Sequence, residues 1–194
     1  MKNSVIAFIL RFIFGILTRR INRYNEHGQE HGRWIILHAD GRAEEGHFVN
    51  GKMHGHWVAR WPDGFVSEGP FVNGKQNGHW VLRHADDTVY EGQYLDGKSH
   101  GHWVRRSADG GVTEGPFVDG KPHGHCVVRL ADGRVEEGPF VDGKPHGYWV
   151  MRLADGRVQK GPFVDGKQHG KWVVRFPDGT EEKINYRNGE IVDE

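Results

Sequence analysis

The stretch GPFVDGKPHG occupies residues 115–124 and returns letter for letter at residues 138–147, and a near copy, GPFVDGKQHG, follows at residues 161–170. The glycine that opens each copy recurs every 23 residues, and two further glycines of the unit keep the same step. A fixed period between 20 and 50 residues is the signature of a repeat array. Because the spacing contains no insertion or deletion, the sequence predicts that every loop is part of the repeating geometry.

Each unit contains two short runs with the chemistry of β-strands, for example residues 135–141 and 148–153, which are rich in valine and aromatic residues. Asp-Gly dipeptides, a strong hairpin signal, follow both runs. The connections are too short for parallel crossovers, so the strands must be antiparallel. The predicted fold is all-β: an elongated single-layer antiparallel β-meander of 23-residue hairpin repeats, preceded by one N-terminal apolar helix.

Alternation along the strands places one set of aromatic residues on a single face of the predicted sheet. The opening and the third glycine of each unit are predicted on the same face, where a bare backbone leaves a groove for a ring from the neighbouring strand. Cys126 occupies a position that is otherwise tryptophan. The aromatic residues of this predicted interaction face are Trp34, Phe48, Trp57, Phe71, Trp80, Tyr94, Trp103, Phe117, Phe140, Trp149, Phe163 and Trp172.

The opposite face carries a column of arginines, one per unit. Glutamates also stand just before the opening glycine, among them Glu68, Glu91, Glu114 and Glu137. We favour ion pairs between the two columns, and the alternative is that the arginines bind phosphate groups, to which a guanidinium presents a planar fork. The candidate phosphate or lipid contacts are Arg60, Arg83, Arg106, Arg129, Arg152 and Arg175.

The segment YEGQYLDGKSHGHWV at residues 90–104 resembles a MORN repeat (membrane occupation and recognition nexus). The resemblance covers roughly residues 28–190, in about seven copies, and rests on the spacing of Tyr90, Gly92, Tyr94, Gly97, His100 and Gly101. Two features depart from the family pattern: its first tyrosine is present only at Tyr90, and its last glycine is replaced by tryptophan or Cys126. The resemblance implies an elongated single-layer sheet that acts as a scaffold, an interaction module or a membrane-proximal module.

The first 23 residues, which begin MKNSVIAFILRFIFGILTRR, do not follow the repeat. Their spacing of apolar residues predicts a strongly apolar amphipathic helix, and the arginines that follow it suit anionic lipid headgroups. The sequence thus divides into a predicted anchor at residues 1–23, the repeats at 24–191 and a tail at 192–194. The predicted membrane or partner anchor consists of Phe8, Ile9, Arg11, Phe12, Ile13, Ile16, Leu17, Arg19, Arg20 and Arg23.

Four interpretations of this segment remain open. It lies in the membrane interface or among apolar helices of a partner, which we favour; it spans the membrane, although its apolar run is short for a span; it is a cleaved signal peptide; or it folds back on the aromatic face of its own sheet. A span would place the repeats in the cytoplasm, because basic residues follow the apolar run. We therefore expect a membrane-associated protein with its repeats on the cytoplasmic side.

Composition argues against several other classes. The 26 basic and 26 acidic residues balance, which is not the charge of a nucleic-acid-binding domain. Cys126 is the single cysteine, so an intrachain disulfide is impossible. His-Gly-His at residues 54–56, 100–102 and 123–125 suggests metal binding, but the first histidine holds a turn position in six units, so we favour a structural role in which the imidazole bonds a turn carbonyl.

These observations predict a non-enzymatic protein, because a catalytic residue should occur once rather than in every unit. We expect no cofactor, no metal and no nucleic acid. The leading hypothesis is a scaffold or protein-interaction subunit, tethered to a membrane or membrane complex by its N-terminal helix. The alternatives are a module that binds anionic lipid and, by resemblance to bacterial proteins with similar repeats, an antitoxin-like neutralising partner.

Overall fold

A computed structural model of the protein describes residues 21–193. These residues divide between Gly78 and His79 into two compact units, and each unit is described by itself. Every regular element in residues 21–193 is a β-strand. Of the N-terminal helix predicted at residues 1–23, residues 1–20 lie outside the described residues, and with them every anchor residue except Arg23.

The N-terminal unit is an antiparallel meander in which each strand pairs with the next along the chain. This order follows from the sequence, because each strand is separated from its neighbour by a short turn. Its strands are β1 (Arg23–Tyr24), β2 (Glu30–Leu37), β3 (Ala43–Val49), β4 (Lys52–Arg60), β5 (Val66–Val72) and β6 (Lys75–Gln76). Strand β7 (Gly78–Arg83) begins at the last residue of this unit.

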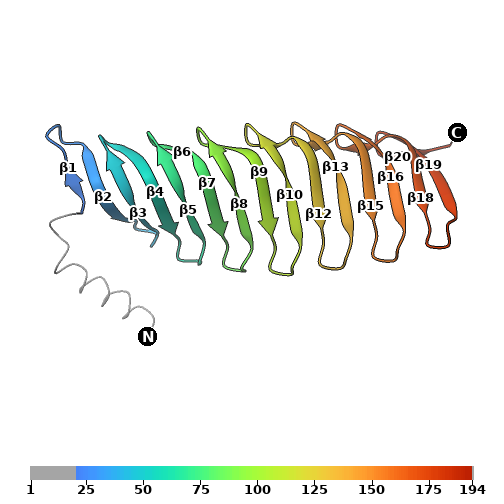
Figure 1. Ribbon diagram of the computed structural model, residues 1–194, viewed down its shortest axis with the longest axis horizontal. Helices are drawn as coiled ribbons and strands as arrows, with labels where there is room; N and C mark the ends of the chain where they lie inside the picture. The colour runs from blue at the N-terminus through green and yellow to red at the C-terminus, as the bar shows by residue number, and fades with distance from the viewer. Residues whose placement is uncertain (1–20, 194) are drawn as a thin grey trace. The chain divides into compact units, whose positions relative to one another are not determined.

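The C-terminal unit repeats the same meander, and Figure 1 shows its strands following one another in chain order. Its strands are β8 (Val89–Leu95), β9 (Lys98–Arg106), β10 (Val112–Val118), β11 (Lys121–Pro122), β12 (Gly124–Arg129), β13 (Val135–Val141), β14 (Lys144–Pro145), β15 (Gly147–Arg152), β16 (Val158–Val164), β17 (Lys167–Gln168), β18 (Gly170–Arg175), β19 (Glu181–Arg187) and β20 (Glu190–Val192). The prediction of an all-β antiparallel meander of hairpin repeats is confirmed in each unit.

Two kinds of turn connect the strands, one at each end of the hairpins. At the first, Asp142 (φ 49°) and Gly143 (φ 85°) both have positive φ, which is the requirement of a two-residue type I′ hairpin. At the second, Leu130 N donates to Arg134 O at 2.9 Å, and the Asp132 carboxylate accepts from Arg134 N at 3.1 Å. Both turns use Asp-Gly, as the sequence predicted: Asp142 and Gly143 are both left-handed in the first, whereas in the second only Gly133 has positive φ and Asp132 accepts a hydrogen bond.

The second strand of each 23-residue repeat bulges opposite the opening glycine. Glu114 on β10 pairs with Val127, and Phe117 pairs with Pro122. Residues 115–116 of β10 therefore lie opposite the four residues 123–126. The extra residues form a bulge, at which a strand bends. Gly124, with φ of 101°, lies in this bulge, and His123 N donates to Pro116 O across it at 2.9 Å.

The structure corrects both ends of the predicted repeat region. Residues 21–23, assigned to the helix, belong to the sheet: Ile21 forms a bridge with Arg33, and Arg23 pairs with His31 in β1. The Asn22 side chain fixes this start, because it accepts from Ile35 N at 2.9 Å and donates to Ile35 O at 3.1 Å. At the other end, Val192 pairs with Asn185 and is part of β20 rather than of a tail.

Candidate interaction surface

The predicted aromatic face is present in both units as a ladder of rings in edge contact. In the C-terminal unit the ring centroids of Phe140 and Trp149 lie 5.3 Å apart, and those of Trp149 and Phe163 lie 5.6 Å apart. In the N-terminal unit Trp34 contacts Phe48 at 5.6 Å, and Phe48 contacts Trp57 at 5.0 Å. Edge-to-face geometry at these distances is favourable beyond the burial of area alone.

Trp57, Trp103, Trp149 and Trp172 each lie flat on the opening glycine that precedes them in the chain. A Cβ atom at Gly138 would overlap the ring of Trp149, and one at Gly161 would overlap the ring of Trp172. The indole Nε1 atoms of these tryptophans donate to Pro139 O at 3.1 Å and to Pro162 O at 3.0 Å. The predicted packing of ring on bare backbone is therefore confirmed for the opening glycine, and the indole is also tied to the backbone.

The third glycine of the 23-residue repeat has a different role from the one predicted. It does not receive a ring: Gly147 has φ of 95° in the bulge, and a Cβ atom there would lie 2.9 Å from Cγ of Pro139. Positive φ is a conformation that side chains other than glycine rarely adopt. Backbone geometry, and not a groove for an aromatic ring, is thus the reason for this glycine.

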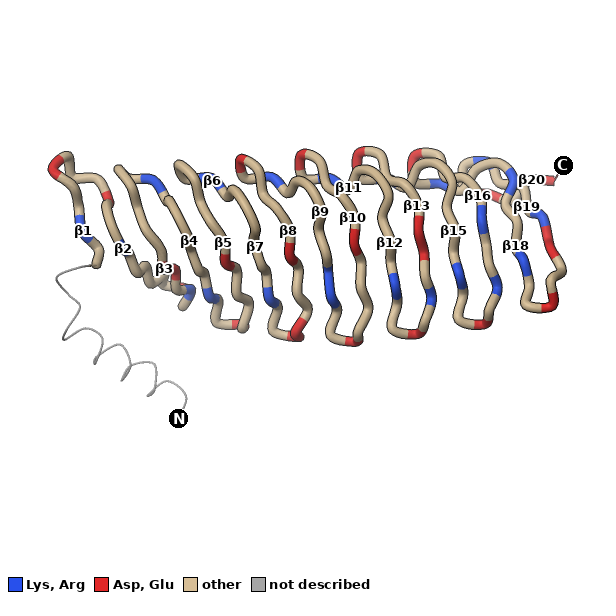
Figure 2. The backbone as a smooth tube through the Cα atoms, in the orientation of Figure 1, with Lys and Arg blue, Asp and Glu red and all other residues tan. Residues whose placement is uncertain are grey.

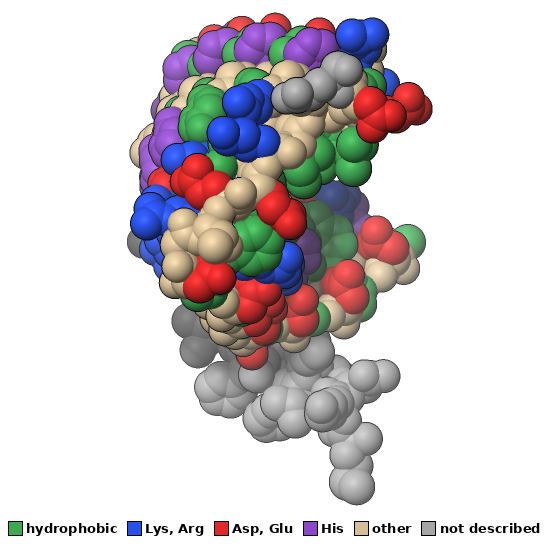
Figure 3. Space-filling model, turned by 90° about the vertical axis from the view of Figure 1, so that its right-hand side faces the viewer, with side chains coloured by type: hydrophobic (Ala, Val, Ile, Leu, Met, Phe, Trp, Pro, Cys, Tyr) green, Lys and Arg blue, Asp and Glu red, His purple; other side chains and the backbone are tan. Residues whose placement is uncertain are grey.

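The two kinds of ring differ in exposure, which refines the predicted face. Trp57, Trp149 and Trp172 are 2%, 4% and 1% exposed, so the indoles are the core of a single layer. The phenylalanines of the ladder are only half-buried. Figure 3 looks at the end of the C-terminal unit and shows it hollowed on one side, with hydrophobic side chains inside the hollow. The surface available to a partner is therefore made by the phenylalanines rather than by the tryptophans.

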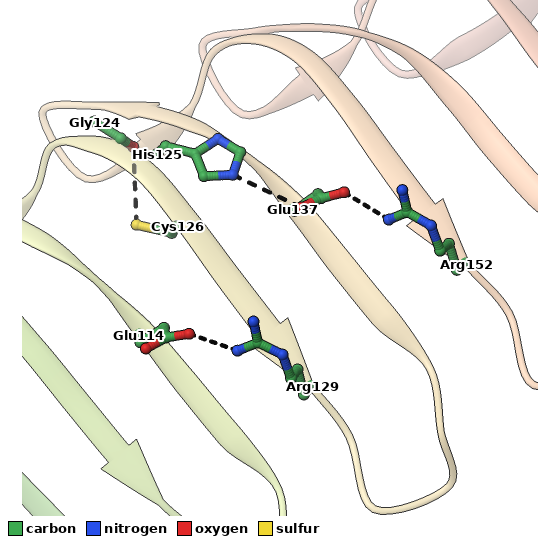
Figure 4. Close-up of polar contacts among 7 residues, drawn as sticks. All are labelled: Glu114, Gly124, His125, Cys126, Arg129, Glu137 and Arg152. Atoms are coloured by element: carbon green, nitrogen blue, oxygen red, sulfur yellow. Dashed lines mark hydrogen bonds and ion pairs between the residues drawn. The ribbon is translucent and has the colours of Figure 1, made fainter.

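The opposite face carries the predicted ladder of ion pairs. In Figure 2, the positions of basic and acidic residues recur on successive strands of the C-terminal unit. Figure 4 shows Glu114 directed to Arg129 and Glu137 directed to Arg152, each at 2.5 Å. Arg106 pairs with Glu91 in the same way. The hydrogen bond from Arg152 holds the pKa of Glu137 below its ordinary value, and the hydrogen bond from Arg129 does the same for the pKa of Glu114.

The ladder has two exceptions among the arginines that the sequence singled out. Within the described residues, neither Arg60 nor Arg175 has a carboxylate at ion-pair distance. Glu45, which stands where a partner of Arg60 is expected, pairs instead with Arg33. At Arg175 the corresponding position is Lys160, so a second basic residue stands where other repeats have the glutamate of the ion pair.

The recurrent histidines line the turns and the charged face. His146 Nδ1 lies 3.7 Å from a carboxylate oxygen of Asp165, and His123 Nδ1 lies 3.8 Å from one of Asp142. His146 Nδ1 also accepts a hydrogen bond from Asp165 N at 3.4 Å. These imidazoles thus contact the backbone N–H or the carboxylate of the next turn rather than the turn carbonyl that was predicted. Across residues 21–193, no group of three or more histidine, cysteine, aspartate or glutamate side chains is arranged to hold a metal ion.

A pocket opens on the aromatic face of the C-terminal unit where Cys126 replaces tryptophan. Its volume is about 180 Å³, and its walls include Trp103, Phe117 and Phe140. Cys126 is buried, and this burial raises the pKa of its thiol. The sequence contained the signal for this site, because Cys126 was seen to break the tryptophan row, but only the packing shows that the space is left open.

Arg105 and Tyr90 also line this pocket, and both depart from the repeat. Arg105 Nε donates to Tyr90 Oη at 3.0 Å, and its guanidinium carbon lies 5.7 Å from the centroid of the tyrosine ring. The residues at the position of Arg105 in the neighbouring units are apolar, namely Ala59, Leu82, Val128, Met151 and Val174. Sequence reasoning did not single out Arg105 as a site residue, although this departure is visible in the repeat.

No helix within the described part of the chain is long and apolar enough to cross a membrane.

Comparison with known proteins agrees with the repeat. The family model described as MORN repeat matches residues 45–66, 90–112, 114–133, 137–156 and 160–181. A search of curated proteins finds no match.

Among solved structures, the chain is similar to the TCP domain of SAS-4 (dCPAP) from Drosophila melanogaster in complex with a proline-rich motif of Ana2, with 13% identity over 79% of this chain and 90% of that chain and a TM-score of 0.42. It is also similar to the TCP10 domain of CPAP from Danio rerio, with 14% identity over 88% and 91% of the two chains and a TM-score of 0.36. Likeness at this level carries no argument about function.

Proposed function

This chain belongs to the MORN repeat family, and from that premise we infer that it is a non-enzymatic scaffold whose aromatic face binds a protein partner. The observation that carries the proposal is the half-buried phenylalanine row. In a sheet of one layer the apolar face needs a cover, and residues 21–193 supply neither a helix nor a second sheet layer to cover it. Apolar surface left open in this way marks interaction sites.

The proposed partner surface can be tested by site-specific cross-linking in the full chain. Photoreactive p-benzoylphenylalanine at Phe163, on the aromatic face, should cross-link one stoichiometric protein in cells that produce this chain naturally. The matched control places the same group at His125, which is exposed beside Glu137 on the charged face. Equal cross-linking from both positions, or none from Phe163, would count against a scaffold that binds through its aromatic face.

A second part of the proposal concerns residues 1–20. Their apolar run, followed by Arg19 and Arg20, suits a membrane surface or a membrane complex. Deletion of residues 1–20 should move the protein from the membrane fraction to the soluble fraction, whereas Arg19→Gln with Arg20→Gln should make membrane association weaker and less sensitive to salt. Membrane association that survives the deletion would contradict this anchor.

A second candidate function is binding of anionic lipid, and Arg175 with Lys160 is the observation in its favour. Because these cations have no ion-pair partner among the described residues, they remain available to phosphate groups. Vesicle flotation should then require anionic lipid and should weaken on Lys160→Glu, while Lys144→Glu serves as a control of equal charge change. The three arginines that are already paired with glutamates make this the weaker candidate. No observation here favours the antitoxin hypothesis.

A further inference from the structure

The aromatic ladder of the C-terminal unit is interrupted at one position. Elsewhere a tryptophan stands between two rings, as Trp149 does between Phe140 and Phe163. At Cys126 the corresponding ring is missing, so Phe117 and Phe140 lose the neighbour that would lie between them. The two rings and Trp103 instead become walls of the Cys126 pocket.

The size and lining of the Cys126 pocket suit one aromatic ring. Its volume of about 180 Å³ is similar to the roughly 150 Å³ of an engineered apolar cavity that binds benzene. The apolar lining of this pocket offers water few polar partners. Aromatic side chains that fill such pockets are the usual anchors of protein interfaces.

One wall of the pocket carries a positive charge. Arg105 uses Nε to bond Tyr90, which leaves the terminal guanidinium nitrogens available to an acceptor. Glu114 is the other charged residue of the lining, and its carboxylate is already bonded to Arg129. Glu136, which pairs with Val128, lies one strand further along the same face and limits the attraction for an anion. The charge at the pocket thus favours a carboxylate modestly.

We propose that the Cys126 pocket receives one aromatic side chain of a protein partner, with a carboxylate of that partner beside Arg105. The identification of the occupant as part of a protein rests on the proposed scaffold function. The affinity of the pocket for an aromatic ring does not depend on that function. Cys126, Arg105 and Tyr90 each break a repeat that is otherwise regular, and local departures from a consistent pattern are expected at functional sites.

The pocket can be tested with small probes on the full-length protein. N-acetyl-tryptophan, which has a carboxylate, and N-acetyl-tryptophanamide, which has none, are titrated while the backbone amides of Trp103 and Val128 are followed by NMR. We expect saturable shifts with both probes and affinity a few-fold higher for the acid. Arg105→Gln should abolish this preference and leave binding of the amide unchanged.

Filling the pocket should abolish binding. In Cys126→Trp the new indole has a bare glycine below it, Gly115, and Pro116 O as an acceptor, as Trp149 has Gly138 and Pro139 O. We expect this variant to lose at least 10-fold in affinity for both probes, because the space is occupied, and to melt at a higher temperature. Cys126→Leu fills less of the space and provides the same test if the tryptophan variant does not fold. Unchanged affinity in the filled pocket, or no saturable shift in the wild type, would overturn the proposal.

A matched variant opens a second pocket elsewhere. Trp149→Cys removes the ring between Phe140 and Phe163, and the residue at the position of Arg105 is then Val128. We expect this variant to bind the amide at the new pocket as well, without preference for the acid there. Binding confined to the Cys126 pocket would mean that ring-sized space alone is insufficient and would contradict the size argument.

The same variants separate this inference from the proposed function. If Phe163 cross-links a partner in the wild type and in Cys126→Trp with equal yield, the scaffold stands and the pocket is not the partner's anchor. If the probes bind but nothing cross-links from Phe163, the pocket stands as a ring site and the scaffold proposal fails. If the partner cross-links from Phe163 in the wild type but not in Cys126→Trp, the result supports both the scaffold function and the pocket as its anchor.

Discussion

At the scale of single residues, the structure depends on pairs of unequal side chains on neighbouring strands. A glycine with no side chain lies under the largest side chain, and this arrangement buries Trp149 and Trp172 in a sheet of a single layer. Burial of an aromatic side chain on bare backbone replaces the second layer from which most domains build a core. The glycine is therefore as much a core residue as the tryptophan.

Gly138→Ala should destabilise the protein by about 1–3 kcal/mol, the usual cost of overpacking, because the added methyl group overlaps the ring of Trp149. The measurement is urea unfolding followed by tryptophan fluorescence. The control is a double-mutant cycle with Trp149→Val, in which the same alanine should cost much less. An equal cost in both backgrounds would show that backbone propensity, rather than ring overlap, accounts for the glycine.

At the scale of elements, neighbouring strands are joined on the charged face by arginine and glutamate. Arg129 on β12 bonds Glu114 on β10, and Arg152 on β15 bonds Glu137 on β13. These groups are largely solvated, so each pair contributes little by itself, about 0.2–1 kcal/mol. Repetition along the sheet fixes the register of each strand pair and neutralises the arginines that a phosphate ligand would otherwise meet.

The Glu137–Arg152 pair predicts a specific pH dependence. Because the folded pKa of Glu137 is depressed below its ordinary value of 4.5, the pair stabilises the protein above that pH and loses its contribution as the pH falls through the folded pKa. Glu137→Gln should thus lower the free energy of unfolding at pH 7 by about 0.2–1 kcal/mol, with a difference that closes as the pH falls below 4.5.

Urea midpoints between pH 3 and pH 8 check this prediction. Glu190→Gln, at an exposed glutamate with no ion-pair partner in the described sheet, is the control and should show no such closing difference. High salt should shrink the effect of Glu137→Gln, because exposed charges are screened. A difference that persists unchanged at low pH would mean that the side chain, and not its charge, matters.

At the scale of the whole molecule, the constant period is the organising property. Side chains alternate between faces with a period of two, so a shift of one residue moves an entire strand's side chains to the wrong face. The 23-residue step, kept without exception from Gly46 to Gly161, preserves the aromatic face and the charged face together. A whole 23-residue repeat can then be removed without changing the register of the rest, because each repeat contacts mainly its neighbours. Removal of part of a repeat changes the register.

Deletion of residues 138–160, one whole unit, should leave a cooperatively folded protein, because Glu137 then precedes Gly161 as it precedes Gly138 now. Deletion of residues 138–159 removes one residue fewer and should unfold the following hairpin. Both deletions remove Trp149, so thermal unfolding followed by near-ultraviolet circular dichroism compares them directly. Equal melting temperatures for the two deletions would contradict the register argument.

The sequence by itself determined the meander, the two turns and the two faces. These properties are local, because they follow from strand alternation, Asp-Gly turns and a period that every unit repeats. It also predicted that Phe and Trp share a face and that the arginine column pairs with the glutamate column, since the paired residues lie on adjacent strands. The approach of Trp149 to Gly138 was predictable for the same reason.

Only the tertiary structure decided the remaining features, because they depend on how far side chains reach and on how the backbone bends. It assigned the third glycine, such as Gly147, to a bulge with positive φ, and it showed that the tryptophans are buried while the phenylalanines stay half-buried. It also showed that the missing ring at Cys126 leaves a pocket beside Arg105. Residue spacing reports which face a side chain occupies, but space that is left empty is a property of the packed neighbours.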